Sequence, residues 1–139
     1  MEVKLALLAD YANVTKEGKL NVMGVFSQIN APVLPWVHPQ MQLVLQLEAG
    51  PAEWGKDKRL EIKLLEQDGR HILSIGADLK VPRGQSGRPV QLQSIMSFVN
   101  VPFEAEGDYC FHILLGEDEK KGVPLRVSLT PPQQPTPQV

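Results

Sequence analysis

Cys110 and His112 are the two residues whose types and spacing come closest to a chemically reactive pair. They stand two positions apart in GDYCFHILL, so both side chains point to the same face of an extended strand. A thiol beside an imidazole can act as a nucleophile, and both groups are also zinc ligands. The sequence supplies no third group to orient the imidazole and no further ligands at a metal-binding spacing. A small hydrolase or metal enzyme using Cys110 and His112 is therefore one alternative, and two half-buried strand residues are the favoured interpretation.

Other motifs of catalysis and nucleotide binding are missing from the sequence. It contains no GxSxG elbow, no GxxxxGK[ST] or GxGxxG loop and no HExxH helix. The acidic run 117–119 is followed directly by Lys120 and Lys121, which is typical of a solvated hairpin tip. We therefore expect a protein that is not an enzyme, with no catalytic residues, no metal and no cofactor.

Two tryptophans fall in segments expected to be loops, on either side of a strand at 41–48. An exposed tryptophan can stack on a sugar or form a hot spot in a protein interface. Trp54 is therefore a candidate platform in a small-ligand or carbohydrate-binding module, which is a second alternative function. For both Trp36 and Trp54 we favour a ring that folds back over the end of the core.

The composition is that of an ordinary globular domain, and its charge balance does not favour nucleic acid or a membrane as a partner. The net charge is −2 and the pI about 5.9, so no general attraction to nucleic acid or to an acidic membrane is expected. One cysteine excludes an intrachain disulfide and favours a reducing compartment. The apolar run 5–9 is shorter than a signal-peptide core, and no run is long enough to span a bilayer. We expect a soluble, cytoplasmic protein.

Alternation of apolar and polar residues with period two recurs along the chain and predicts strands in place of helices. Many short strands with frequent turn signals favour an all-β fold, an antiparallel two-layer β-sandwich of immunoglobulin-like or C2-like architecture, with a barrel as the alternative. The expected domain covers 1–130, and 131–139 is expected to be a flexible proline-rich tail. Its Pro132 and Pro135 also have the PxxP spacing of a polyproline ligand, the less favoured interpretation. The eight expected strands are 2–9, 19–29, 41–48, 59–67, 70–81, 90–102, 109–115 and 123–129.

Two hairpins have registers that the sequence predicts. Asp68-Gly69 is typical of a type I′ turn, and closing the chain there places one set of apolar residues on one face, which we expect to be buried. Those pairs are Leu64 with Leu73, Ile62 with Ile75, and Leu60 with Ala77. The second hairpin is expected to turn through 116–122, with the pairs Leu115–Val123, Ile113–Leu125, Phe111–Val127 and Tyr109–Leu129.

The stretch EGKLNVMGVF, residues 17–26, is apolar on both faces of an extended chain. This pattern predicts a central strand, covered on one face by the opposite sheet and on the other by a loop or a partner. Gly24 interrupts the strand, which indicates a bulge or the close approach of another backbone.

If every connection reverses the strand direction, the loops gather at two ends of opposite charge. Lys80, Arg83 and Arg88 make one end basic, and the loop 103–108 makes the other end acidic. Contact between unlike ends of two copies would assemble the chain head to tail. The candidate binding residues for a ligand or a protein partner are Trp54, Arg83, Arg88, Glu104, Glu106 and Asp108.

The block LADYANVTKEGKLNVMGVFSQI, followed by a proline-rich loop, the 42–48 strand, EQDG and EGDYCFHILL, resembles a family of small uncharacterised bacterial all-β domains. The core of the resemblance is G-K-L-N-x-x-G-x-F, residues 18–26. It implies a bacterial all-β domain with no assigned activity and no site residues to carry over. EGDYCF is also similar to the tyrosine corner of immunoglobulin sandwiches, but Cys110 follows Tyr109 directly and has no partner cysteine.

These observations together favour a non-enzymatic module that binds protein, as part of a homo-oligomer or a larger assembly.

Overall fold

The computed structural model describes residues 1–130 and is built from strands in two sheets. Within these residues the only helical segment is the short 3₁₀ turn η1 (Pro51–Glu53). The tail expected at 131–139, with its PxxP spacing, lies outside the described residues. The strands are β1 (Glu2–Val14), β2 (Leu20–Phe26), β3 (Gln28–Ala31), β4 (Trp36–Ala49), β5 (Asp57–Glu66), β6 (His71–Lys80), β7 (Val90–Phe103), β8 (Gly107–Leu115) and β9 (Asp118–Leu129).

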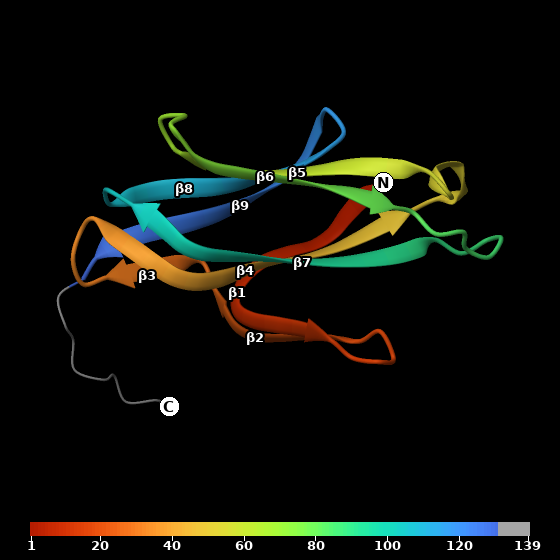
Figure 1. The fold of residues 1–139 in the computed structure, drawn as a ribbon, viewed down its shortest axis with the longest axis horizontal. Helices are drawn as coiled ribbons and strands as arrows, with labels where there is room; N and C mark the ends of the chain where they lie inside the picture. Colours follow the sequence, from red (N-terminus) through yellow and green to blue (C-terminus); the bar gives the residue numbers. More distant parts are fainter. Residues whose placement is uncertain (131–139) are drawn as a thin grey trace.

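The two sheets pack face to face around one apolar core (Figure 1). Sheet A has the strand order β2-β1-β4-β7, and the strongly curled sheet B has the order β3-β9-β8-β5-β6. All neighbouring strands are antiparallel except β3 and β9, which are parallel. Phe98 of sheet A and Phe111 of sheet B pack against each other across the core, with tilted rings whose centroids are 5.4 Å apart. The predicted all-β fold is thereby confirmed.

The register predicted for the β5–β6 hairpin is confirmed, although the turn differs. Leu64 pairs with Leu73 and Ile62 with Ile75, as expected from the alternation. The loop has three residues, since the Gly69 amide donates to the Glu66 carbonyl and Gly69 has a φ of 90°, while Asp68 lacks the positive φ of a type I′ turn. A bulge close to the loop absorbs the extra residue, so the rest of the ladder keeps the predicted pairs.

Burial of every apolar residue in this hairpin was an incorrect expectation. Ile62 and Leu64 are fully buried, but Ile75 is 42% exposed and Leu73 is half-buried. The physical reason is position, because β6 is the outermost strand of sheet B and has a neighbour on one side only.

The register predicted for the second hairpin is wrong. Phe111 pairs with Val123 and Tyr109 with Leu125, so the pairing differs from the expected one by four residues. The chain turns directly after Leu115, where Gly116 has a φ of 64° and occupies the first central position of a two-residue turn. A shift by an even number of residues leaves each side chain on its predicted face, and the core-facing residues from Tyr109 to Val127 are accordingly buried, whereas Leu129 at the end of β9 is 48% exposed.

Strand β1 takes part in two layers. It pairs with β4 along Glu2–Ala9, and then with β2 along Leu8–Val14. Residues 10–24, here called the hairpin arm, fold back over the outer face of sheet A (Figure 1). A second apolar cluster lies between the arm and the sheet, and it contains Ala9, Ala12, Val44, Leu20, Val22 and Ile95.

Two hydrogen bonds fasten the arm to the sheet. The Ala12 amide donates to Gln42 Oε1 at 2.6 Å, and Gln93 Nε2 donates to the Gly18 carbonyl at 3.0 Å. The Gln42 side chain also donates from Nε2 to Ser97 Oγ at 2.9 Å, so this one amide joins β1, β4 and β7.

The expected central strand at 19–29 was therefore a wrong prediction. The segment is divided between β2 and β3, which belong to different sheets, and β2 is an edge strand. One apolar face of β2 packs on the outer face of sheet A. The other face carries Met23 and Val25, which are 58% and 61% exposed. Gly24 has a φ of 70° and leaves no room for a Cβ beside Asp10, so the predicted close approach exists but involves a side chain.

Candidate docking surface at the open edge of strand β7

β7 is the outermost strand of sheet A and carries no charged residue from Val90 to Phe103. One of its edges pairs with β4 along its whole length. The other edge has no neighbouring strand within residues 1–130. Natural edge strands are usually protected by charges, prolines or bulges. β7 has such features only near its end, at Asn100 with a φ of 52° and at Pro102, so residues 90–99 form an unprotected edge.

The other edges of the two sheets are shorter or better protected. β2 spans Leu20–Phe26 and is interrupted by Gly24, and β3 spans only Gln28–Ala31. β6 carries His71, Asp78 and Lys80. Among the four edges of the described fold, β7 therefore offers the longest uncharged row of backbone groups.

β6 lies on the same side of the molecule as β7 and adds apolar surface to the open edge. The first residues of β6 and the last residues of β7 line one pocket, through Ile72 and Pro102. Ile75 is partly exposed on β6, and Val99 on the outer face of β7 is 68% exposed. The open side of the sandwich thus combines apolar side chains with backbone groups that lack a strand neighbour.

At one end of β7, Trp54 supports the loop 81–89 that carries Arg83 and Arg88. The Gly55 amide donates to the Val81 carbonyl at 2.8 Å, which holds the base of the loop beside η1. A Cβ placed on Gly84 would lie 3.1 Å from the Trp54 ring, so the ring packs closely against the loop. The indole N–H is buried and has no hydrogen-bond partner within the described part of the chain. This geometry favours a capping role for Trp54 over a sugar platform.

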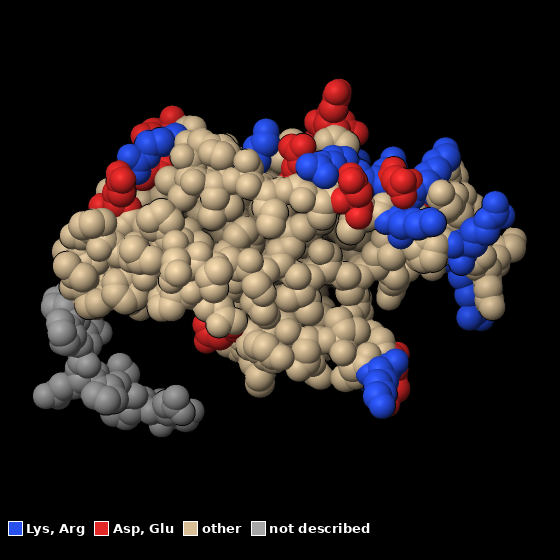
Figure 2. All heavy atoms as spheres, viewed as in Figure 1, with Lys and Arg blue, Asp and Glu red and all other residues tan. Residues whose placement is uncertain are grey.

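Arg83 and Arg88 are both exposed, and neither forms an ion pair with any residue in 1–130. In Figure 2, Lys and Arg side chains gather at the end of the molecule where Figure 1 places this loop. A broad surface without charged side chains crosses the middle of the same view. Basic side chains therefore gather near this loop, as the sequence predicts, and the role of the two arginines in binding stays a prediction.

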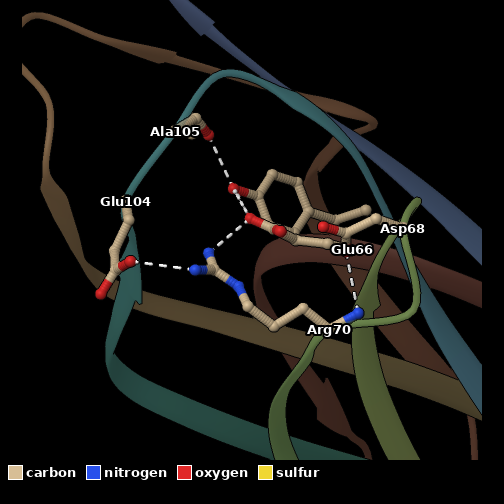
Figure 3. Close-up of polar contacts among 6 residues, drawn as sticks. Glu66, Asp68, Arg70, Glu104 and Ala105 are labelled. Atoms are coloured by element: carbon tan, nitrogen blue, oxygen red, sulfur yellow. Dashed lines mark hydrogen bonds and ion pairs between the residues drawn. The ribbon is translucent and has the colours of Figure 1, made fainter.

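Glu104 follows the last residue of β7 and belongs to a polar network (Figure 3). Arg70 donates from Nη1 to Glu104 Oε2 at 3.1 Å and from Nη2 to Glu66 Oε1 at 2.7 Å. The Glu104 side chain is nevertheless 69% exposed. Its carboxylate is therefore held near the end of β7 and can still accept a second cation.

Tyr109 fixes the loop that carries Glu104. Its hydroxyl donates to the Ala105 carbonyl at 2.6 Å and lies 3.1 Å from Glu66 Oε1. Burial, together with the adjacent Glu66 carboxylate, raises the pKa of Tyr109 to about 12. The bond joins the tyrosine to the backbone four residues upstream, which is similar to a tyrosine corner.

Glu106 and Asp108 lie close to Glu104 in the chain but are used within the fold. Glu106 Oε1 accepts a hydrogen bond from the Leu129 amide at 2.5 Å, and Asp108 pairs with Arg126 at 3.1 Å. The acidic end expected from 103–108 is therefore partly neutralised by internal partners.

The Cys110 and His112 pair has an unexpected third member. His112 Nδ1 lies 2.5 Å from Glu119 Oε1, a contact hidden from the sequence because 119 was expected in a loop. No hydrogen bond joins Cys110 to His112 in the described residues, where no cluster of three metal-ligating side chains occurs either. Burial, and then the Glu119 carboxylate, raises the pKa of the Cys110 thiol. The geometry therefore does not support a thiolate nucleophile here.

None of the candidate binding residues chosen from the sequence lies on β7, so sequence reasoning missed this edge. Its signal was present, because an uncharged stretch runs from Val90 to Phe103 between Arg88 and Glu104 in a chain with 22% charged residues. The arrangement can offer backbone donors and acceptors to an added strand, with opposite charges at the two ends.

Comparisons with known proteins give a family without a known activity. Residues 4–128 match the model of a protein family described only as a family of unknown function. No curated protein matches the chain. Within residues 1–130, no helix has the length and apolar character needed to cross a membrane.

Proposed function

The chain belongs to DUF6941, a family of unknown function, and we propose that it is a non-enzymatic module that binds protein by strand addition to β7. The observation that supports this proposal is the long, uncharged edge of β7 on the open side of the sandwich. A strand added there would gain backbone hydrogen bonds along residues 90–99. Such bonds supply affinity in strand addition, and side chains on alternate positions supply specificity.

Exposed apolar residues beside the edge favour a protein partner. Val99 on β7 and Ile75 on β6 are among the large apolar side chains left exposed by the fold. An added strand with apolar residues at alternate positions would cover them, with a gain of about 25 cal/mol per Å² removed from water.

Three further features belong to this proposal. A bacterial origin is supported by the resemblance of residues 18–26, and a cytoplasmic location by the single cysteine. An immunoglobulin-like form of the sandwich is supported by the hydrogen bond from Tyr109 to the Ala105 carbonyl.

Selection of short random peptides displayed on phage tests the proposed function. We expect peptides with alternating apolar residues and few charges to be enriched on the wild-type chain. Gln91→Lys/Val99→Lys places two charges on the open edge and should abolish their binding. Met23→Lys/Val25→Lys is the matched control, since it places two charges on exposed positions of β2, the opposite edge of the same sheet. Absence of enrichment, or peptides that bind the β7 variant as well as the wild type, would contradict the proposal.

A further inference from the structure

We propose that the strand added to β7 is β7 of a second copy, paired antiparallel around Met96. This inference rests on the proposed function and names the partner of the same edge. The result would be a two-fold symmetric dimer in which sheet A of one copy continues into sheet A of the other.

The charges that flank β7 are complementary in this arrangement. Arg88 lies eight positions before Met96, and Glu104 lies eight positions after it. In an antiparallel pair centred on Met96, residues 93–99 of the two copies pair with each other, and Arg88 of each copy comes opposite Glu104 of the other beyond Asn100 and Pro102. Two-fold symmetry makes this contact twice, once at each end of the paired strands.

Both partners have the exposure that this contact needs. Arg88 is exposed and has no ion pair among residues 1–130. Glu104 keeps most of its side chain in solvent although it accepts from Arg70. No charged residue lies between them on the strand, so the pairing places no like charges opposite each other.

The faces of the two strands also agree along residues 93–99, before the positive φ of Asn100 reverses the alternation so that Val101 and Phe103 face the core. Centring on Met96 places even-numbered residues opposite even-numbered residues, for example Phe98 opposite Ser94 of the other copy. Met96 and Phe98 face the core. The core side of one sheet therefore continues into the core side of the other, because successive side chains on a strand alternate between faces. The two β6 strands also meet at this junction, where Ile75 is left exposed in the single copy.

The other uncharged edge does not have this complementarity. A pair of β2 strands centred on Met23 would place Lys19 opposite Ser27, and Gly24 would interrupt the paired segment. Charge complementarity therefore selects β7 as the edge for a second copy.

Sedimentation velocity over a range of protein concentrations tests the inference. The wild-type chain should form a dimer, and Gln91→Lys/Val99→Lys should be monomeric, because the substituted position 91 of one copy and position 99 of the other become like-charged diagonal neighbours across the paired strands. The control Met23→Lys/Val25→Lys should dimerise as the wild type does. Circular dichroism and thermal melting confirm that each variant is folded.

Charge exchange tests the register. Arg88→Glu should weaken the dimer about tenfold, since two attractive contacts become repulsive. Arg88→Glu/Glu104→Arg should restore it, and Arg83→Glu, which alters the same loop outside the paired segment, should leave it nearly unchanged. Salt at about 0.5 M should weaken the wild-type dimer. It should also reduce the gain in dimer affinity that Glu104→Arg gives when it is added to Arg88→Glu.

Each outcome decides between the inference and the proposed function. A wild-type chain that is monomeric at high concentration, while peptides still bind to β7, would overturn the second copy as partner and leave the proposed function intact. A dimer that is insensitive to Gln91→Lys/Val99→Lys would overturn the inference. A dimer sensitive to this change but not restored by the charge exchange would overturn the register around Met96.

Discussion

Replacement of Gln42 by leucine should loosen the hairpin arm and destabilise the whole fold. Gln42 is 7% exposed, and its side-chain amide bonds to the Ala12 amide on β1 and to Ser97 on β7. Leucine has a similar volume but neither accepts nor donates. Two hydrogen bonds are lost at about 0.5–1.5 kcal/mol each, and the buried Ala12 N–H is left without a partner at about 1–3 kcal/mol. The expected loss of unfolding free energy is about 2–6 kcal/mol.

Urea denaturation of the two variants Gln42→Leu and Ser97→Ala measures this effect. Ser97→Ala removes only the bond from Gln42 Nε2 and leaves the Ala12 amide paired, so its cost should be about 1 kcal/mol. Hydrogen exchange at the Ala12 amide should accelerate in Gln42→Leu and stay slow in Ser97→Ala. If Gln42→Leu is no more destabilising than Ser97→Ala, or if exchange at Ala12 is unchanged, the role assigned to Gln42 is wrong.

Three further predictions concern the core, alkaline pH and the thiol. Ile62→Ala should reduce the unfolding free energy by about 2–5 kcal/mol, because the Ile62 side chain is fully buried. Ile75→Ala, at the cross-strand partner that is 42% exposed, should reduce it clearly less. Equal losses for the two variants in urea denaturation would refute this prediction. The raised pKa of Tyr109, about 12, means that the unfolded chain loses this proton first, so stability should fall between pH 10 and 12 by up to about 2–3 kcal/mol. Tyr109→Phe should lack this additional alkaline loss, and parallel pH profiles for the two proteins would contradict the assignment. Since burial raises the pKa of Cys110, iodoacetamide should alkylate it more slowly in the folded chain than in urea, and equal rates would show that the thiol is exposed.

The sequence predicts those parts of the fold in which local signals and alternation agree. In the β5–β6 hairpin, the turn at Asp68-Gly69 and the apolar pairs specify one register, and the structure has it. In the β8–β9 hairpin the acidic and basic run after Gly116 resembles a long loop, although the chain turns at once and the run continues as strand β9. Each side chain of this hairpin still lies on its predicted face, because the observed register differs from the predicted one by an even number of residues.

The hairpin arm could not be predicted because its position depends on contacts far along the chain. Gln42 follows the polar alternation of β4 and gives no sign that it is buried beneath Ala12. The candidate docking edge is partly visible, since the absence of charge between Arg88 and Glu104 can be read from the sequence. That β7 is an edge strand depends on its pairing with β4 alone, which no local pattern specifies.

The parallel pairing of β3 with β9 has a consequence for how the chain acquires its structure. Gln28 and Ser128 are neighbours in sheet B although 100 positions separate them in the chain. Pairing between such distant segments raises contact order, and folding is correspondingly slow. During synthesis β3 lacks its strand partner until β9, near the end of the described residues, has left the ribosome. The β5–β6 hairpin can form as soon as Lys80 has emerged. Ribosome-bound chains that end before Asp118 should therefore protect the β5–β6 amides from hydrogen exchange and leave those of Gln28–Ala31 unprotected.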